Sequence, residues 1–174
     1  MPDDDSFHTF DGLNLPLFRS SRCATLLRYW NQLRGNRAFP ARSEIDPGAI
    51  KPILPHVLLV GIEYEPFRAL YRLIGTEIAR FAKFDFTGRY ADALVFQDDG
   101  AEDWTRYYRE VVTSRRPGIG INHWTVEGNF RRWIEFIICP LSGDGTRIDQ
   151  CIALEDYEHM NPTEIDTLPA VSEH

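Results

Sequence analysis

The stretch YRLIGTEIARFAKFDFTGRY, residues 71–90, begins as a strand, stops at a glycine, runs through a short apolar and charged segment, and reaches a second glycine. The alternation of FRALYRLIG (67–75) is typical of a half-buried strand, and the preceding apolar run HVLLVGIEY (56–64) predicts a buried one. Glu65-Pro66 lies between them as a turn. These residues predict an antiparallel hairpin that ends at Gly75.

The remaining sequence predicts one more antiparallel group and two amphipathic helices. Strand patterns follow at 118–126, 130–141 and 147–157, joined by turn-forming stretches. One helical face repeats over 20–34 and another over 101–116. Asp46-Pro47 predicts a short helical turn within the proline-rich connector 39–56. This order indicates the α+β class, with one antiparallel sheet packed on a helical layer.

Composition excludes several classes of function. The 174 residues are 43% hydrophobic and 13% aromatic, which suffices for one domain with its own core. The formal net charge of −7 argues against nonspecific binding to nucleic acid or to an acidic membrane. No apolar run reaches the roughly 18 residues of a membrane span, and the start MPDDDSFHTF lacks the features of a signal peptide. We therefore expect a cytoplasmic protein without membrane insertion.

The ends of the chain and its cysteines carry less information. We expect 1–18 to be a flexible acidic tail, 19–157 to be the folded domain, and 158–174 to be a second flexible tail.

Cys23, Cys139 and Cys151 match no zinc or redox spacing, so we expect buried free thiols and no metal site. Six arginines and no acid lie between residues 19 and 43. This stretch is either a solvated face or a docking surface for an acidic partner.

Side-chain parity predicts which strand faces are buried. Ile134, Phe136 and Ile138 share one face of the strand 130–141, so we assign them to the interior. Ile148, Ile152 and Leu154 share one face of the strand 147–157, and we assign them to the interior as well. The opposite faces are apolar as well, with Trp133, Ile137, Cys139, Cys151 and Ala153.

The helix 20–34, from the same chain or from a second copy, is the expected cover for this outer face. We predict a homodimer whose contact residues are Leu26, Trp30, Leu33, Trp133 and Ile137.

Six short segments carry a resemblance to a known family. They are LLRYWNQLRG (26–35), FPARSEIDP (39–47), LPHVLLV (54–60), YRLIGTEI (71–78), TGRY (87–90) and CPLSGDG (139–145). In this order they resemble the PAS_5 family, small stand-alone bacterial PAS proteins formerly described as a domain of unknown function. The resemblance covers roughly residues 24–157.

The resemblance implies a PAS fold, with a five-stranded antiparallel sheet, short helices over one face and the N-terminal amphipathic helix on the other. The segment after Gly75 then crosses the open face as the lid of an internal cavity. The cavity candidates are Phe84, Tyr90, Trp104, Tyr108, Ile121, His123 and Phe136. A filled core without a ligand is the alternative for these side chains.

The same resemblance argues against two PAS cofactors and leaves the ligand unknown. Haem-binding PAS proteins carry their histidine on the long helix, and residues 101–116 contain none. Covalent flavin chemistry needs a cysteine in the middle helices, and residues 76–117 contain none.

No nucleotide-binding, hydrolase or metalloprotease motif occurs in the chain. We therefore expect a non-catalytic sensory or adaptor protein that binds a small apolar or amphipathic molecule, or a protein partner, and signals in trans to a separate protein. One alternative is a small cone-shaped enzyme with isomerase-like acid–base chemistry on His123 and Glu135. The other is an interaction module without any ligand.

Overall fold

A computed structural model describes residues 6–11, 16–95, 104–126, 130–158, 160–168 and 170–173. Its main sheet has six strands in the order β1-β5-β6-β7-β2-β3, and every pairing is antiparallel. The strands are β1 (Ser6–Thr9), β2 (Val57–Tyr64), β3 (Phe67–Ile74), β5 (Gly118–Val126), β6 (Phe130–Leu141) and β7 (Gln150–Asp156). Strands β4 (Leu94–Val95) and β8 (Ser172–Glu173) form a separate pair. The five expected strands are confirmed, and β1 is a sixth.

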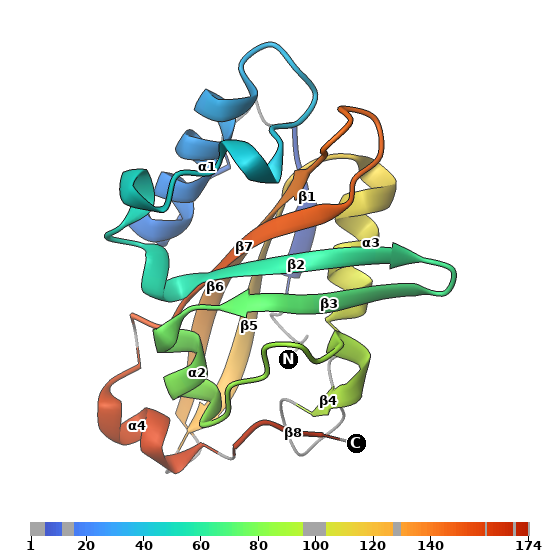
Figure 1. Ribbon diagram of the computed structural model, residues 1–174. Helices are drawn as coiled ribbons and strands as arrows, with labels where there is room; N and C mark the ends of the chain where they lie inside the picture. Colours follow the sequence, from blue (N-terminus) through green and yellow to red (C-terminus); the bar gives the residue numbers. More distant parts are fainter. Residues whose placement is uncertain are drawn as a thin grey trace.

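Helices cover both faces of the sheet (Figure 1). They are α1 (Ser21–Arg34), α2 (Thr76–Ala82), α3 (Thr105–Ser114) and α4 (Pro162–Thr167), with 3-10 turns η1 (Arg42–Glu44), η2 (Pro47–Ile50), η3 (Leu54–His56) and η4 (Ala91–Ala93). Helix α1 contacts β6 and β7 on one face, which we call the outer face. Helices α2 and α3 lie over the other, the inner face. None of the helices in the described part of the chain has the length and apolarity needed to cross a membrane.

Helix α1 begins and ends where expected, and it covers the outer face of the sheet of its own chain. Ser20 caps its start by accepting a hydrogen bond from the Cys23 amide (3.0 Å), and Gly35 ends it with φ 56°. Leu26 and Trp30 are buried, and the Trp30 indole donates to the Pro140 carbonyl (2.8 Å). The outer face therefore needs no second copy to cover it.

Because α1 covers the outer face, several residues predicted to form the dimer contact are buried within one chain. Leu26, Trp30 and Ile137 are buried within a single chain, so they cannot meet a second copy while α1 stays in place. Leu33 and Trp133 keep partial exposure. Of the two expected covers for the outer face, the helix of the same chain is the one that the structure shows.

Two buried acids hold the start of α1 on the sheet. Glu135 and Asp156 face each other across β6 and β7. The Glu135 carboxylate accepts hydrogen bonds from the Arg19 and Ser20 amides (2.7 and 2.8 Å), and the Ser20 hydroxyl donates to Asp156 (2.5 Å). Arg22 adds an ion pair to Asp156 (2.8 Å). The first turn of the helix is thereby positioned by charge-assisted hydrogen bonds as well as by apolar contacts.

The expected tails contain regular structure in their described parts. Residues 6–9 form β1 and pair with β5, and residues 162–167 form α4, which starts at an Asn161 cap. Phe7 on β1 reaches the inner face, where its ring lies 5.7 Å from that of Phe136. Strand β1 is held by its distant partner β5. Helix α4 has a local signal that the expectation overlooked, a capping box between Asn161 and Glu164 with Pro162 at the first helical position.

The predicted faces are correct for β6 and reversed for β7. Phe136 lies on the inner face, and Ile137 lies under α1. Ile152, however, adjoins Leu26 and Trp30 of α1, so Ile152 and Leu154 are outer and Cys151 and Ala153 are inner. Since both faces of β7 are apolar, the pattern could not distinguish them, and only the pairing with β6 does so.

Trp30→Asp should unfold the protein rather than dissociate a dimer. The substitution places a charge in a buried site and removes the hydrogen bond to Pro140, so we expect a loss of about 3–5 kcal/mol in the free energy of unfolding, measured by urea denaturation. Leu33→Asp, at a partly exposed position of the same helix, is the control and should cost much less. A Trp30→Asp protein that keeps its stability and only changes its mass in light scattering would contradict this assignment.

The two glycines of the 71–90 stretch have different roles. Gly88 adopts φ 83°, a left-handed conformation that favours glycine, as expected of a turn. Gly75 has an ordinary φ of −67°. A Cβ at Gly75 would lie 2.1 Å from the Pro55 carbonyl oxygen, so this glycine allows η3 to pack against the junction of β3 and α2.

Gly75→Ala should therefore destabilise the protein by overpacking. We expect a loss of about 1–3 kcal/mol in the free energy of unfolding, because backbone atoms of η3 must move to admit the methyl group. Gly48→Ala is the matched control, since its Cβ would meet only the side chain of Asp46. Equal stabilities of the two variants in chemical denaturation would show that the close approach at Gly75 is unimportant.

Candidate functional site

The inner face, where a cavity was expected, is filled with aromatic side chains. Trp104, Tyr108 and Phe136 are all buried there, and the rings of Trp104 and Phe136 lie 4.7 Å apart. The space left between α2, Trp104 and β7 is about 10 Å³. Small-molecule sites usually measure about 300–1,000 Å³. The described interior therefore matches the filled-core alternative.

Glycines help to fill this interior by admitting rings. A Cβ at Gly118 would lie 2.3 Å from the Phe7 ring, and a Cβ at Gly120 would lie 2.3 Å from the Phe136 ring. Phe7 also contacts Tyr107, at 4.7 Å between ring centroids. The N-terminal strand thus contributes directly to the core between the sheet and α3.

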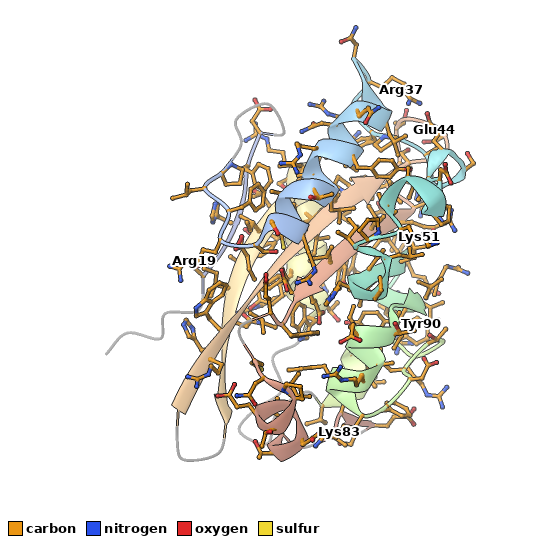
Figure 2. All side chains as sticks on the ribbon, turned by 90° about the vertical axis from the view of Figure 1, so that its left-hand side faces the viewer. Arg19, Arg37, Glu44, Lys51, Lys83 and Tyr90 are labelled. Atoms are coloured by element: carbon orange, nitrogen blue, oxygen red, sulfur yellow. The ribbon has the colours of Figure 1, made fainter. Side chains whose placement is uncertain are left out.

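The other cavity candidates lie elsewhere. Phe84 is only partly buried. Tyr90 lies toward the surface, where its hydroxyl donates to Glu63 (2.9 Å) and the Arg68 guanidinium stacks 3.5 Å from its ring centroid. Figure 2 labels Tyr90 at the side of the molecule.

Ile121 and His123 were assigned to the wrong side of the sheet. Ile121 pairs with Glu135, and His123 pairs with Trp133. Directly opposed residues share a face, so both lie on the outer face with Glu135. Strand pairing thus separates these two residues from Trp104, Tyr108 and Phe136.

One titratable group is enclosed in the aromatic interior. Glu155 is buried and accepts a hydrogen bond from the Tyr157 hydroxyl. The Tyr157 ring stacks on Phe81 of α2 at 3.9 Å. Desolvation raises the pKa of Glu155 to about 7 and raises the pKa of Tyr157 well above its usual value. The inner face therefore holds an acid that titrates near neutral pH, in contact with the segment that crosses the sheet.

His123 and Glu135, the acid–base pair of the enzyme alternative, both lie on the outer face. The Glu135 carboxylate, however, holds the start of α1 in place. Both oxygens of Glu135 accept hydrogen bonds from backbone amides at the start of α1. Burial raises the pKa of Glu135, and these amides oppose the shift. A shallow hollow of about 350 Å³ lies beside Glu135, lined by His8, Arg19 and Ile121. In the described part of the chain, the geometry of Glu135 is that of an anchor for α1.

A larger hollow than those of the interior and of Glu135 lies on the outer face, next to the area that α1 covers. This groove, which we call the outer groove, measures about 510 Å³. It is lined by the turns η1 to η3, by β2, β3 and β7, and by the first residues of α2. Its apolar walls include Ile45, Ile50, Leu54, Leu59, Leu73 and Ile152. Ile45 and Ile152 also contact the α1 layer, so the groove begins where that layer stops.

Two cations stand at the outer groove. Arg42 begins η1 and Lys51 follows η2, and both belong to its lining. Figure 2 shows Lys51 on the short-helix segment, on the side of the molecule that carries α1. Leu73 is 41% exposed, which is unusual for a large hydrophobic side chain here. The groove therefore combines apolar walls with positive charge, an arrangement typical of a small-molecule site.

Sequence reasoning missed this groove because it treated 39–56 as a connector. The four prolines of that segment did indicate short turns, and Asp46 does cap η2 by accepting from the Gly48 amide (2.9 Å). The apolar residues Ile45, Ile50 and Leu54 among these prolines were the available signal. No pattern within residues 39–56 indicated that these side chains would face Leu73.

This fold, an antiparallel sheet with crossing helices on one face and an N-terminal helix on the other, defines a PAS-type sensory domain. The PAS domain family model PAS_5 matches residues 18–153. The chain belongs to this PAS family. A comparison with curated proteins found no match.

Solved structures agree on the fold. The chain is similar to a structure described as "Structure of an RNA-binding Light-Oxygen-Voltage Receptor", with a TM-score of 0.50 and 14% sequence identity. The similarity covers 95% of this chain and 41% of that chain. At this identity the likeness concerns the fold alone.

Glu155→Gln should change how stability depends on pH. The pKa of about 7 in the folded state exceeds the ordinary value of about 4.3, so the folded state holds this proton more tightly than the unfolded state does. The resulting stabilisation is complete below the unfolded pKa and is lost as the pH rises through about 7. Glutamine cannot ionise, and it can still accept the hydrogen bond from Tyr157.

Urea denaturation of wild type and variant at several pH values measures the effect. We expect the wild type to lose up to about 3 kcal/mol relative to Glu155→Gln between roughly pH 4 and pH 8. Glu110→Gln, at an exposed site on α3, serves as the control. A difference between wild type and Glu155→Gln that does not vary with pH would show that Glu155 is not buried in this way.

Proposed function

We propose that this protein is a non-catalytic sensory or adaptor module that binds a small apolar or amphipathic molecule, or a protein partner, at the outer groove and signals to a separate protein. The observation that carries the proposal is the contrast between the two faces. The hollow between the described residues of α2, Trp104 and β7 measures about 10 Å³, whereas the outer groove offers about 510 Å³. Membership of the PAS family supports a sensory role.

Helix α2 provides a physical connection between the groove and the interior. Thr76, its first residue, lines the groove, and Phe81 stacks on Tyr157, which donates to the buried Glu155. An occupant that moves the start of α2 would therefore alter the contacts of Phe81. A ligand shifts such an equilibrium only by its difference in affinity for the two positions of the helix. The groove lining supplies contacts for that difference.

The cellular setting follows as part of the proposal. Cys23, Cys139 and Cys151 are free and buried, which suits a reducing compartment such as the cytoplasm. A homodimer remains part of the proposal. Of the contact residues predicted for it, Leu33 and Trp133 are the ones that stay partly exposed. An acid–base enzyme built on His123 and Glu135 is the competing function.

A stability screen with two matched variants tests the proposal. Leu73→Asp alters the groove at an exposed position, and Tyr108→Phe alters the interior. We expect compounds that stabilise the wild type, by about 2.7 kcal/mol at a hundredfold excess over the Kd, to lose their effect on Leu73→Asp and keep it on Tyr108→Phe. Native mass spectrometry of freshly purified protein would detect a ligand that is already bound.

Other results would count against it. Compounds whose effect depends on Tyr108 and not on Leu73 would place the site in the interior. If nothing stabilises the protein, the sensory half fails and only an adaptor remains. A turnover that is lost on His123→Ala and kept in Leu73→Asp would favour the enzyme.

A further inference from the structure

The outer groove has an uncompensated positive charge in addition to its apolar walls. Arg42 and Lys51 line it, and neither forms an ion pair with an acid among the residues that the structure describes. Arg72 extends over Gly61 on the same face, next to Leu73, and likewise has no ion pair within the described ranges. An occupant that carries a negative charge would therefore find cations that no neighbouring acid already satisfies.

The acids on the surrounding elements are already engaged. Glu44 of η1 pairs with Arg37 (2.6 Å), and Glu77 of α2 pairs with Arg80 (3.3 Å). Asp46 accepts from the amide that follows its proline and so caps η2. Glu44 and Glu77 thus pair with arginines outside the groove lining, and Asp46 is engaged by a backbone amide, so the described acids nearby form no ion pair with Arg42 or Lys51.

The shape of the apolar surface favours a small molecule over a protein. Leu17 and Leu73 are the large hydrophobic side chains that the described part of the chain exposes. The groove floor, by contrast, consists of side chains such as Ile50 and Ile152 that are nearly fully buried. A protein partner usually needs a broad apolar patch at the surface, whereas an alkyl chain needs only a hollow of this volume.

We propose that the outer groove binds a single-chain alkyl carboxylate, with the chain on the aliphatic walls between Leu54, Leu73 and Ile152 and the carboxylate at Arg42 and Lys51. This inference rests on the proposed function and names the class of molecule that the groove takes. The aliphatic walls bury methylene groups, which gives affinity without directional contacts. The two cations select the head group by charge-assisted hydrogen bonds.

Three probes with the same chain and different heads test the head group. They are dodecanoate, dodecanol and dodecyltrimethylammonium, each used below the concentration at which it self-associates, with binding measured by calorimetry. We expect dodecanoate to bind about tenfold more tightly than the cationic probe. The preference should shrink at high salt, because exposed charges are screened.

Variants locate the site. Arg42→Glu combined with Lys51→Glu should abolish or reverse the preference for dodecanoate, and Leu73→Asp should weaken all three probes. Arg116→Glu is the matched control, since this exposed arginine lies outside the groove. Circular dichroism checks the fold of each variant. If a variant fails to fold, the amide chemical-shift changes of the wild type on adding dodecanoate should concentrate at residues 42–54 and 73–76.

Several outcomes would overturn the inference. Equal affinity for the three heads would remove the role of the cations, and shift changes centred on Trp104 and Tyr108 would place the chain in the interior. If dodecanoate does not bind but another compound binds in a way that depends on Leu73, the inference fails and the proposed function stands. If no compound depends on Leu73, the inference fails together with the small-molecule half of the proposed function.

Discussion

The central strands β6 and β7 carry apolar side chains on both faces, and this constraint shapes the rest of the molecule. Ile137 and Leu154 point to the outer face, whereas Phe136 and Ala153 point to the inner one. Each face must be removed from water, because exposed apolar area of this extent is unfavourable. Helix α1 covers one face and helices α2 and α3 cover the other (Figure 1).

The attachment of α1 combines apolar packing with polar anchoring. Glu135 and Asp156 lie opposite each other beneath its start, and two like charges so placed would ordinarily destabilise the pairing. Backbone amides, the Ser20 hydroxyl and Arg22 satisfy them instead. Glu135, which the sequence suggested together with His123 for acid–base chemistry, instead anchors the start of α1. A buried carboxylate whose oxygens are occupied by hydrogen bonds within the fold is not available to a substrate.

The position of the outer groove depends on how far the helices extend over each face of the sheet. On the inner face Phe7, Trp104 and Phe136 meet ring to ring, and the glycines of β5 make room for them. On the outer face α1 stops before β2 and β3, and the short proline-containing turns bridge the gap without filling it. The groove is therefore a consequence of incomplete cover. Helix α2 begins at this groove and ends over the buried Glu155, which couples the two faces through one short helix.

The sequence by itself determined the family of this protein and the main elements between residues 20 and 157, but β1 and α4 were not predicted from it. The apolar period of 20–34, the hairpin around Glu65-Pro66 and the cap at Asp46 are local signals, and the structure bears them out. Six short segments in order were enough to indicate a PAS fold, and the family match confirms it. Short-range periodicity carries this information because it reflects the pitch of a helix or strand, which depends on the residues nearby.

Only the tertiary structure decided which faces meet. Ile152 and His123 lie on the opposite sides from those expected, because β7 is apolar on both faces and β5 takes its orientation from its pairing with β6. Phe7 enters the core from a segment with no local pattern, and Leu73 meets the turns of 39–56 although nothing in either stretch indicates the other. Such contacts join residues far apart in the chain. Their partners are set by how strands pair and layers stack, which the spacing within a single segment does not record.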